Sequence, residues 1–223
     1  MIAAVLFDLD GTLADTAPDL ARALNLQRAA RGLLPLPVSY LRRFASMGAR
    51  GLIRAGFDIG PEDDRFRPLC DEFHELYALD VCRETRLFPG MEEVLEWIEA
   101  RGLPWGIVTN KIERYTLPLV KQLGLDAKAR TVVSGDTTNR AKPHAEPLLF
   151  ASRHCGIAPP ECLYAGDDVR DVQAARAAGM RIVVARYGYL GPGSAPETWG
   201  ADALIDAPTD LIAYLSGLRP ANA

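Results

Sequence analysis

The chain has 223 residues, enough for one large domain or for one domain with a smaller insertion around a substantial core. Hydrophobic residues make up 48% and charged residues 24%, which is ordinary for a globular protein and excludes a wholly disordered chain. The net charge of −4 argues against a general nucleic-acid binder, and no apolar stretch approaches the roughly 20 residues of a membrane-spanning helix.

Short apolar runs that do not alternate with polar residues predict strands buried on both faces, as in a parallel sheet covered by helices. In chain order, these runs are residues 3–7, 105–108, 131–133, 162–165, 181–185 and 203–205. Segments with helical spacing lie between the runs and end at glycines, at residues 91–100, 113–123, 146–155 and 168–178. The alternation indicates an α/β fold with a doubly wound, Rossmann-like parallel sheet. Pro118 falls inside the second helix, where we expect a kink or a late start.

Residues 15–86 interrupt this alternation, because they contain helical patterns and no good strand. Thr16 predicts a helix N-cap with Pro18 in the first turn, and a further helix is expected over residues 66–79. We therefore expect a helical cap domain at 15–86, inserted into a catalytic core of residues 1–14 and 87–223. Such an insertion after the first strand lies at the carboxyl edge of the sheet, where these folds bind ligands.

Asp8 and Asp10 come directly after the first predicted strand, and Gly11 permits a tight turn behind them. Residues two apart on an extended chain face the same side, so both carboxylates converge beyond the strand. Two close carboxylates repel each other and need a cation, a shared proton or divided acid and base roles. A solvated junction is the plainer alternative, since turns favour Asp and Gly in any case.

A second acidic cluster, Asp167, Asp168 and Asp171, follows another buried run and precedes a helix. Asp167 occupies the strand end itself. Asp168 is explained equally well as a helix N-cap, and Asp171 as a first-turn residue favoured by the helix dipole.

Other predicted strand ends carry polar groups, namely Thr109 and Asn110, while Lys142 opens the segment before a helix. A lone lysine is usually a surface residue, but here its charge would offset the clustered carboxylates. An all-oxygen ligand set suits Mg²⁺ better than zinc. A nucleophilic carboxylate, a hard cation and donors for phosphoryl oxygens together favour phosphoryl transfer.

In this order, these segments resemble the four motifs of the haloacid dehalogenase-like hydrolase superfamily, and the resemblance spans nearly the whole chain. The matching segments are Asp8–Thr12, Thr109–Asn110, Lys142–Pro143 and Gly166–Asp168 with Asp171. The helical insertion between the first two motifs is similar to the phosphoglycolate phosphatase branch. Two late segments, Arg186–Tyr189 and Trp199–Asp202, also resemble N-acetylmuramic acid 6-phosphate phosphatases, which are close relatives of that branch.

The resemblance implies a Mg²⁺-dependent phosphomonoesterase that works through an aspartyl-phosphate intermediate. It implies that Asp8 attacks phosphorus and that Asp10 is the general acid and then the general base. The implied metal ligands are Asp8, the backbone carbonyl of Asp10, and Asp167. The implied phosphoryl-binding groups are Thr109, Asn110 and Lys142, with Asp171 positioning the metal waters.

Three positions near these motifs depart from the family pattern. His144 and Ala145 stand where the family more often has Asp and Pro, and Asp168 stands where it often has Ser. The roles of His144 and Asp168 therefore stay open.

The expected cap carries a one-signed charge pattern, with seven arginines and no acidic residue between positions 20 and 57. A solvated helix surface explains most of them, although such a patch would also concentrate an anionic substrate. In cap-bearing relatives, the glycine-rich loop at Met47–Gly51 faces the active site. Arg50 is therefore a candidate contact for a substrate carboxylate or another distal group.

The resemblance to the phosphoglycolate phosphatase branch implies 2-phosphoglycolate as the nominal substrate, with N-acetylmuramic acid 6-phosphate as the alternative. A phosphomutase of the same superfamily and a non-catalytic phosphoacceptor or binding module are the other hypotheses. A halide-releasing enzyme is disfavoured, because the Asp10 side chain and the metal site have no task in that reaction.

The four cysteines lack CxxC spacing, and the N-terminus lacks the basic region of a signal peptide. We therefore expect a cytoplasmic protein whose partner is a small-molecule phosphomonoester, with no nucleic acid and no membrane, and with the oligomeric state left open.

Overall fold

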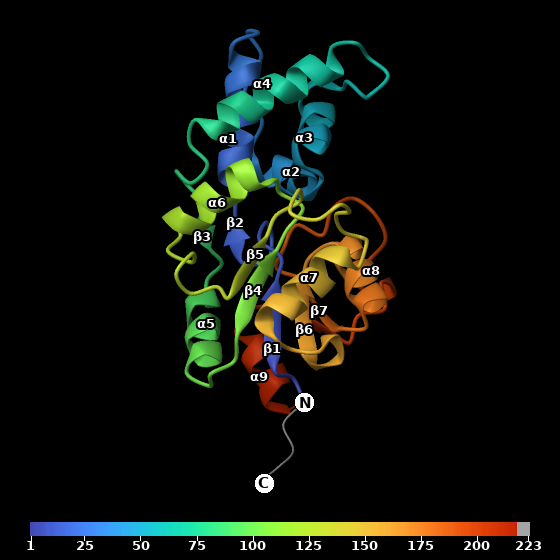
Figure 1. Ribbon diagram of the computed structural model, residues 1–223. Coiled ribbons are helices and arrows are strands. Elements are labelled where there is room, and N and C mark those ends of the chain that lie inside the picture. The colour runs from blue at the N-terminus through green and yellow to red at the C-terminus, as the bar shows by residue number, and fades with distance from the viewer. Residues whose placement is uncertain (218–223) are drawn as a thin grey trace.

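The computed structural model describes residues 1–217 (Figure 1). Within them the core is a fully parallel, six-stranded sheet in the order β5-β4-β1-β6-β7-β8. Its strands are β1 (Ala4–Phe7), β4 (Trp105–Val108), β5 (Thr131–Val133), β6 (Cys162–Gly166), β7 (Arg181–Ala185) and β8 (Ala203–Ile205). Each strand agrees with its predicted run to within one residue, and the predicted fold class is confirmed.

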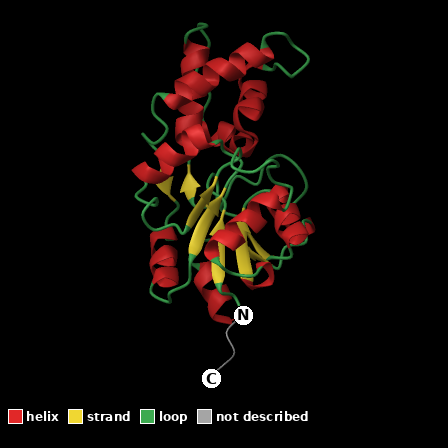
Figure 2. Ribbon diagram, in the orientation of Figure 1, coloured by secondary structure: helices red, strands yellow, loops and turns green. Residues whose placement is uncertain are grey.

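Helices cover both faces of this sheet (Figure 2). Helices α5 (Met91–Glu99), α6 (Glu113–Gln122) and α9 (Asp210–Gly217) share one hydrophobic core, while α7 (Glu146–Cys155) and α8 (Val169–Ala178) share the other. Successive residues of β1 alternate between the two cores, with Val5 and Phe7 in the first and Ala4 and Leu6 in the second. Because both faces are buried, the strands are apolar throughout rather than alternating.

Helix α6 begins at Glu113 and continues through Pro118, so the expected late start does not occur. The two residues that follow the proline, Leu119 and Val120, are buried against the first core. Their packing offsets the backbone hydrogen bond that proline cannot donate.

The inserted segment forms helices that stand above the carboxyl edge of the sheet (Figure 1). They are α1 (Ala17–Ala29), α2 (Val38–Leu41), the 3₁₀ helix η1 (Arg42–Met47), α3 (Gly48–Phe57) and α4 (Phe66–Ala78). We call this segment the cap. The remaining 3₁₀ turns, η2 (Pro159–Glu161) and η3 (Pro196–Thr198), belong to loops of the core. No helix within residues 1–217 has the length and apolar character needed to cross a bilayer.

A two-stranded antiparallel ribbon joins the cap to the core, made of β2 (Ala14–Asp15) and β3 (Arg86–Leu87). Strands this short carry no periodic pattern, so the sequence did not predict them. The division into core 1–14 and 87–223 and cap 15–86 stays a prediction. Its boundaries fall within this ribbon, and residues 218–223 of the predicted core lie outside the described residues.

Helix α1 begins where predicted, with Thr16 at the N-cap position and Pro18 in the first turn. However, the Thr16 side chain does not cap the helix, and this part of the prediction was wrong. Its hydroxyl Oγ1 instead donates to Asp10 Oδ1 at 2.5 Å. The Thr16 hydroxyl therefore faces the core, where the Asp10 carboxylate is a strong acceptor for its proton.

The packing of β4 predicts a large cost for truncating Ile107, which is fully buried between Phe7 of β1 and Val132 of β5. Ile107→Ala should lower the free energy of unfolding by about 2–5 kcal/mol, because a cavity remains between tightly packed elements. The half-exposed Leu117 is the control, and Leu117→Ala should change the free energy of unfolding by less than about 0.5 kcal/mol. Urea unfolding measures both, and equal effects would contradict the assignment of this core.

Candidate active site

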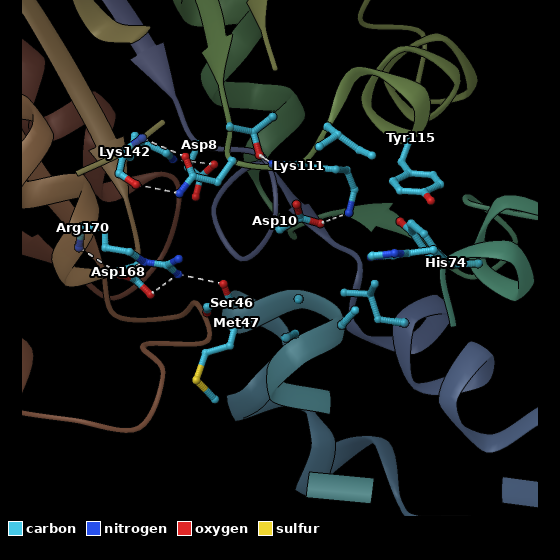
Figure 3. Close-up of a pocket in the computed structure, with 18 of the residues that line it drawn as sticks. Asp8, Asp10, Ser46, Met47, His74, Lys111, Tyr115, Lys142, Asp168 and Arg170 are labelled. Atoms are coloured by element: carbon cyan, nitrogen blue, oxygen red, sulfur yellow. Dashed lines mark hydrogen bonds and ion pairs between the residues drawn. The ribbon is translucent and has the colours of Figure 1, made fainter. Parts of the chain in front are cut away.

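The carboxyl ends of β1, β4 and β6 meet at one edge of the sheet, beneath the cap. Strand β1 lies between β4 and β6, and at such a position the chain connections diverge and leave a crevice. A cavity of about 270 Å³ opens there, between core and cap (Figure 3). The predicted site residues that line it are Asp8, Asp10, Thr109, Asn110, Lys142 and Asp171.

Three carboxylates converge behind this cavity. One oxygen from each of Asp8, Asp167 and Asp171 lies within 4.8 Å of the other two. Asp167 and Asp171 are almost completely buried. Burial, together with repulsion from Asp8 and Asp171, raises the pKa of Asp167 well above its ordinary value. This excess of buried negative charge fits a divalent cation held by carboxylate oxygens.

The Asp167 side chain is held by hydrogen bonds and is packed closely against two glycines. Thr12 Oγ1 donates to its Oδ1 at 3.1 Å, and the backbone N–H of Tyr189 donates to its Oδ2 at 2.7 Å. A Cβ on Gly11 would lie 2.2 Å from Asp167 Oδ2, and one on Gly188 would lie 2.4 Å from Asp167 Cβ. Gly11 is therefore needed for close approach as well as for its turn, where φ is +83°.

Lys142 is the cation that this cluster contains. Its Nζ lies 2.9 Å from Asp8 Oδ1 and 2.7 Å from Asp171 Oδ1, and it donates to the Tyr164 hydroxyl at 2.7 Å. Burial alone lowers the pKa of Lys142, but the charges of Asp171 and Asp8 outweigh that effect and raise the pKa. The ammonium therefore stays charged and is held in one position.

Asn110 braces the loop that carries this lysine. Its Nδ2 donates to the Lys142 carbonyl at 3.0 Å, and its Oδ1 accepts from the Lys142 backbone N–H at 3.0 Å. The predicted phosphoryl-binding residues on two different loops are thus joined directly.

Burial raises the pKa of Asp8 to about 7, against the opposing charge of Lys142. A cation at the carboxylate cluster would add to the effect of the lysine and favour the ionised form. The nucleophilic role predicted for Asp8 requires that form.

Asp10 lies on the cap side of the cluster, and its Oδ1 accepts from two side chains. These donors are Thr16 Oγ1, at 2.5 Å, and Lys111 Nζ, at 2.8 Å. Figure 3 shows the contact between Lys111 and Asp10. Lys111 directly follows Asn110, but no motif or spacing in the sequence predicts a role for it.

Asp168 combines a structural role with a contact to the cap. As the alternative interpretation held, it caps α8: its Oδ1 accepts from the Arg170 backbone N–H at 2.9 Å, and its own N–H donates to Asp171 Oδ2 at 3.0 Å. The Arg170 guanidinium pairs with Asp168 and also donates to the Ser46 carbonyl of the cap at 2.7 Å (Figure 3). No pattern in the sequence predicts this link between core and cap.

Three of the seven arginines in the cap patch pair with carboxylates that lie outside positions 20–57. Arg22 pairs with Asp19, Arg31 with Glu72, and Arg42 with Asp15. Arg50 is exposed on α3 and is not among the residues that line the cavity. His144 is also exposed and outside the lining.

The family model described as haloacid dehalogenase-like hydrolase matches residues 5–185. The chain belongs to this family. The predicted resemblance, including its phosphoglycolate phosphatase-like branch, is confirmed, and so is the prediction of an enzyme of the phosphatase class.

Relatives of similar length support this assignment. The chain is 42% identical to the N-acetylmuramic acid 6-phosphate phosphatase of Pseudomonas aeruginosa, over 95% of this chain and 94% of that one. It is also 42% identical to a phosphoglycolate phosphatase of Xylella fastidiosa, over 92% of this chain and 89% of that one. A crystal structure of a predicted phosphoglycolate phosphatase from Haemophilus somnus has a TM-score of 0.83 and 27% identity, covering 96% and 98% of the two chains.

The contact between Gly11 and Asp167 predicts a specific defect in cation binding. Gly11→Ala should weaken the binding of a divalent cation by about 10- to 100-fold, because the new methyl group displaces Asp167. Gly102→Ala is the matched control, since Gly102 also has a positive φ, +63°, but faces open space. Titration calorimetry with Mg²⁺ measures both variants, and similar affinities would contradict the role assigned to Asp167.

Proposed function

We propose that this protein is a Mg²⁺-dependent phosphomonoesterase that hydrolyses a small phosphorylated metabolite through an aspartyl-phosphate. The observation that carries the proposal is the cluster of Asp8, Asp167 and Asp171 at the floor of a cavity, in which the Lys142 ammonium pairs with Asp8 and Asp171. Such a cluster provides a carboxylate nucleophile beside fixed positive charge, which phosphoryl transfer requires.

In this mechanism Asp8 attacks phosphorus and the leaving alcohol takes a proton from Asp10. Asp10 then removes a proton from the water that hydrolyses the aspartyl-phosphate. Lys142 already lies 2.9 Å from Asp8 Oδ1, so it also reaches the oxygens of a phosphoryl group attached there. Thr109 and Asn110 complete the phosphoryl-binding set at the end of β4.

Mg²⁺ would be held by Asp8, the Asp10 backbone carbonyl and Asp167, and it would neutralise charge on the transferring group. An oxygen of the Asp171 carboxylate also lies within 4.8 Å of one oxygen of each of the other two, so Asp171 would position metal-bound water. These ligands are all oxygens, in keeping with a hard cation.

The nominal substrate is 2-phosphoglycolate, but the cavity wall favours the larger alternative, N-acetylmuramic acid 6-phosphate. Phe73, His74, Tyr77 and Tyr115 line the cavity from α4 and α6. The His74 and Tyr115 rings stack with their centroids 5.8 Å apart (Figure 3), and burial lowers the pKa of His74, so its ring is uncharged at neutral pH. Flat, uncharged rings offer packing area to a sugar ring, whereas a two-carbon acid has little to place against them.

Arg50 remains the proposed contact for a distal group of the substrate. Because it stands outside the cavity lining, this contact requires the cap to move relative to the core. The ribbon of β2 and β3 joins the two parts and is the place where such motion would be absorbed.

Measured phosphate release separates the remaining hypotheses. A phosphomutase would transfer the group to a sugar hydroxyl without stoichiometric release, and a phosphoacceptor module would stay phosphorylated without turnover. The proposed setting is the cytoplasm, with neither nucleic acid nor membrane as a partner.

Loss of the nucleophile should abolish turnover. Asp8→Asn should lower kcat by at least about 10⁴-fold while leaving thermal unfolding cooperative, because the amide cannot form the acyl phosphate. Chelation with EDTA should remove wild-type activity and added Mg²⁺ should restore it. The exposed Asp126→Asn serves as the control. Phosphate release from both candidate substrates measures the effect, and substantial activity of Asp8→Asn would refute the proposal.

The aromatic wall predicts a substrate-dependent defect. Tyr115→Leu should raise KM for N-acetylmuramic acid 6-phosphate by about tenfold, or about 1.4 kcal/mol, because a stacking surface is lost. KM for 2-phosphoglycolate should change much less. Tyr40→Leu is the control, since Tyr40 is exposed and outside the lining. If Tyr115→Leu raised KM equally for both substrates, the aromatic residues that line the cavity would not select between them.

A further inference from the structure

Lys111 is a nearly buried lysine to which the mechanism above gives no role. Its side chain is 8% exposed, and its Nζ lies 2.8 Å from Asp10 Oδ1. Among the ion pairs of the described residues, Lys142 pairs with Asp8 and Asp171, while Lys111 pairs with Asp10. One lysine therefore pairs with the proposed nucleophile, and the other pairs with the proposed general acid.

The cap also holds Lys111 in place. The Lys111 ammonium lies over the ring of Tyr77 on α4, 4.9 Å from its centroid. Tyr77 is almost fully buried, and its ring packs at 5.5 Å from that of Tyr115 on α6. A cation over a desolvated aromatic face is attracted to it, so this wall defines where the ammonium sits.

Both side-chain donors act on the same oxygen of Asp10. Thr16 reaches Oδ1 from the start of the cap, and Lys111 reaches Oδ1 from the loop after β4. With Oδ1 held from two directions, Oδ2 is the oxygen left to exchange a proton with the substrate.

We propose that Lys111 is a positioning residue for proton transfer by Asp10, and that Tyr77 of the cap places it. The inference rests on the proposed function, because it presupposes that Asp10 protonates the leaving alcohol. As the Asp8 oxygen bonds to phosphorus, the P–O ester bond breaks, its electron pair stays on the leaving oxygen, and the Asp10 proton goes to that oxygen. Asp10 is then an anion beside the Lys111 ammonium, so the ion pair strengthens as the proton leaves.

A comparison of leaving groups tests this role. Both candidate substrates release an aliphatic alcohol, which needs a proton, whereas p-nitrophenyl phosphate releases a phenolate that does not. The quantity measured is kcat/KM, because it reports only the steps up to the first irreversible one. Lys111→Met should lower it by about 100-fold for the preferred candidate substrate and by less than about 5-fold for p-nitrophenyl phosphate. With 2-phosphoglycolate as the aliphatic substrate, which has little to place against the aromatic wall, Tyr77→Leu should shift both values in the same directions to a smaller extent.

Three variants keep the test decisive. Lys111→Arg retains the charge and should recover part of the activity on the aliphatic substrate. Lys121→Met removes an exposed lysine of α6 and should leave both rates at the wild-type level. Where Lys111→Met does not fold, Lys111→Gln takes its place in the same comparison.

The outcomes separate this inference from the proposed function. Equal losses on both substrates, or no loss on either, would overturn the role of Lys111. Asp10→Asn is measured beside it and should show the same dependence on leaving group. If Asp10→Asn shows that dependence and Lys111→Met does not, only the inference fails. If Asp10→Asn lacks it, the assigned general acid fails as well.

Discussion

The site depends on one electrostatic constraint: within the described residues, three carboxylates gather at the carboxyl edge of the sheet, and Lys142 pairs with two of them. Asp167 and Asp171 are almost completely shielded from solvent, so water cannot stabilise their negative charge. The Lys142 ammonium already contacts Asp8, Asp171, the Val108 carbonyl and the Tyr164 hydroxyl. Carboxylates so placed are costly unless further positive charge reaches them. Gly11 and Gly188 leave room for the Asp167 side chain, and the Thr12 hydroxyl donates a hydrogen bond to it. These neighbours hold the carboxylate in place but add no positive charge. The Mg²⁺ proposed above would supply the missing positive charge.

The cap contributes the second half of the arrangement. Asp10 accepts from Thr16 at the first turn of the cap, and Lys111, its other partner, lies against Tyr77 of α4. Arg170 links the opposite side, from the helix that follows the acidic cluster to the Ser46 carbonyl. The cap therefore touches the residues expected to move protons, whereas the core alone fixes those expected to hold the phosphoryl group.

The sequence predicted the sheet and the strand-end residues because both follow from local rules. Parallel strands buried on two faces read as unbroken apolar runs, and the carboxyl ends of neighbouring strands meet at one edge. It did not predict the partners of side chains that reach across the molecule. Thr16 occupies an N-cap position, but its side chain bonds to Asp10. Arg31 and Arg42 pair with acidic residues that lie outside the segment in which the arginines were counted. Lys111 gave no signal, since a lysine after a strand is common, and only the fold shows that it is buried against Asp10.

A crystal structure of the protein with Mg²⁺ and beryllium trifluoride, which mimics a phosphoryl group on a carboxylate, tests the central claim most directly. We expect the fluoride adduct on an Asp8 oxygen, contacted by Lys142, with the metal about 2.1 Å from oxygens of Asp8 and Asp167. An adduct on another residue, or a metal that binds away from Asp167 while Asp8 stays unmodified, would contradict the account.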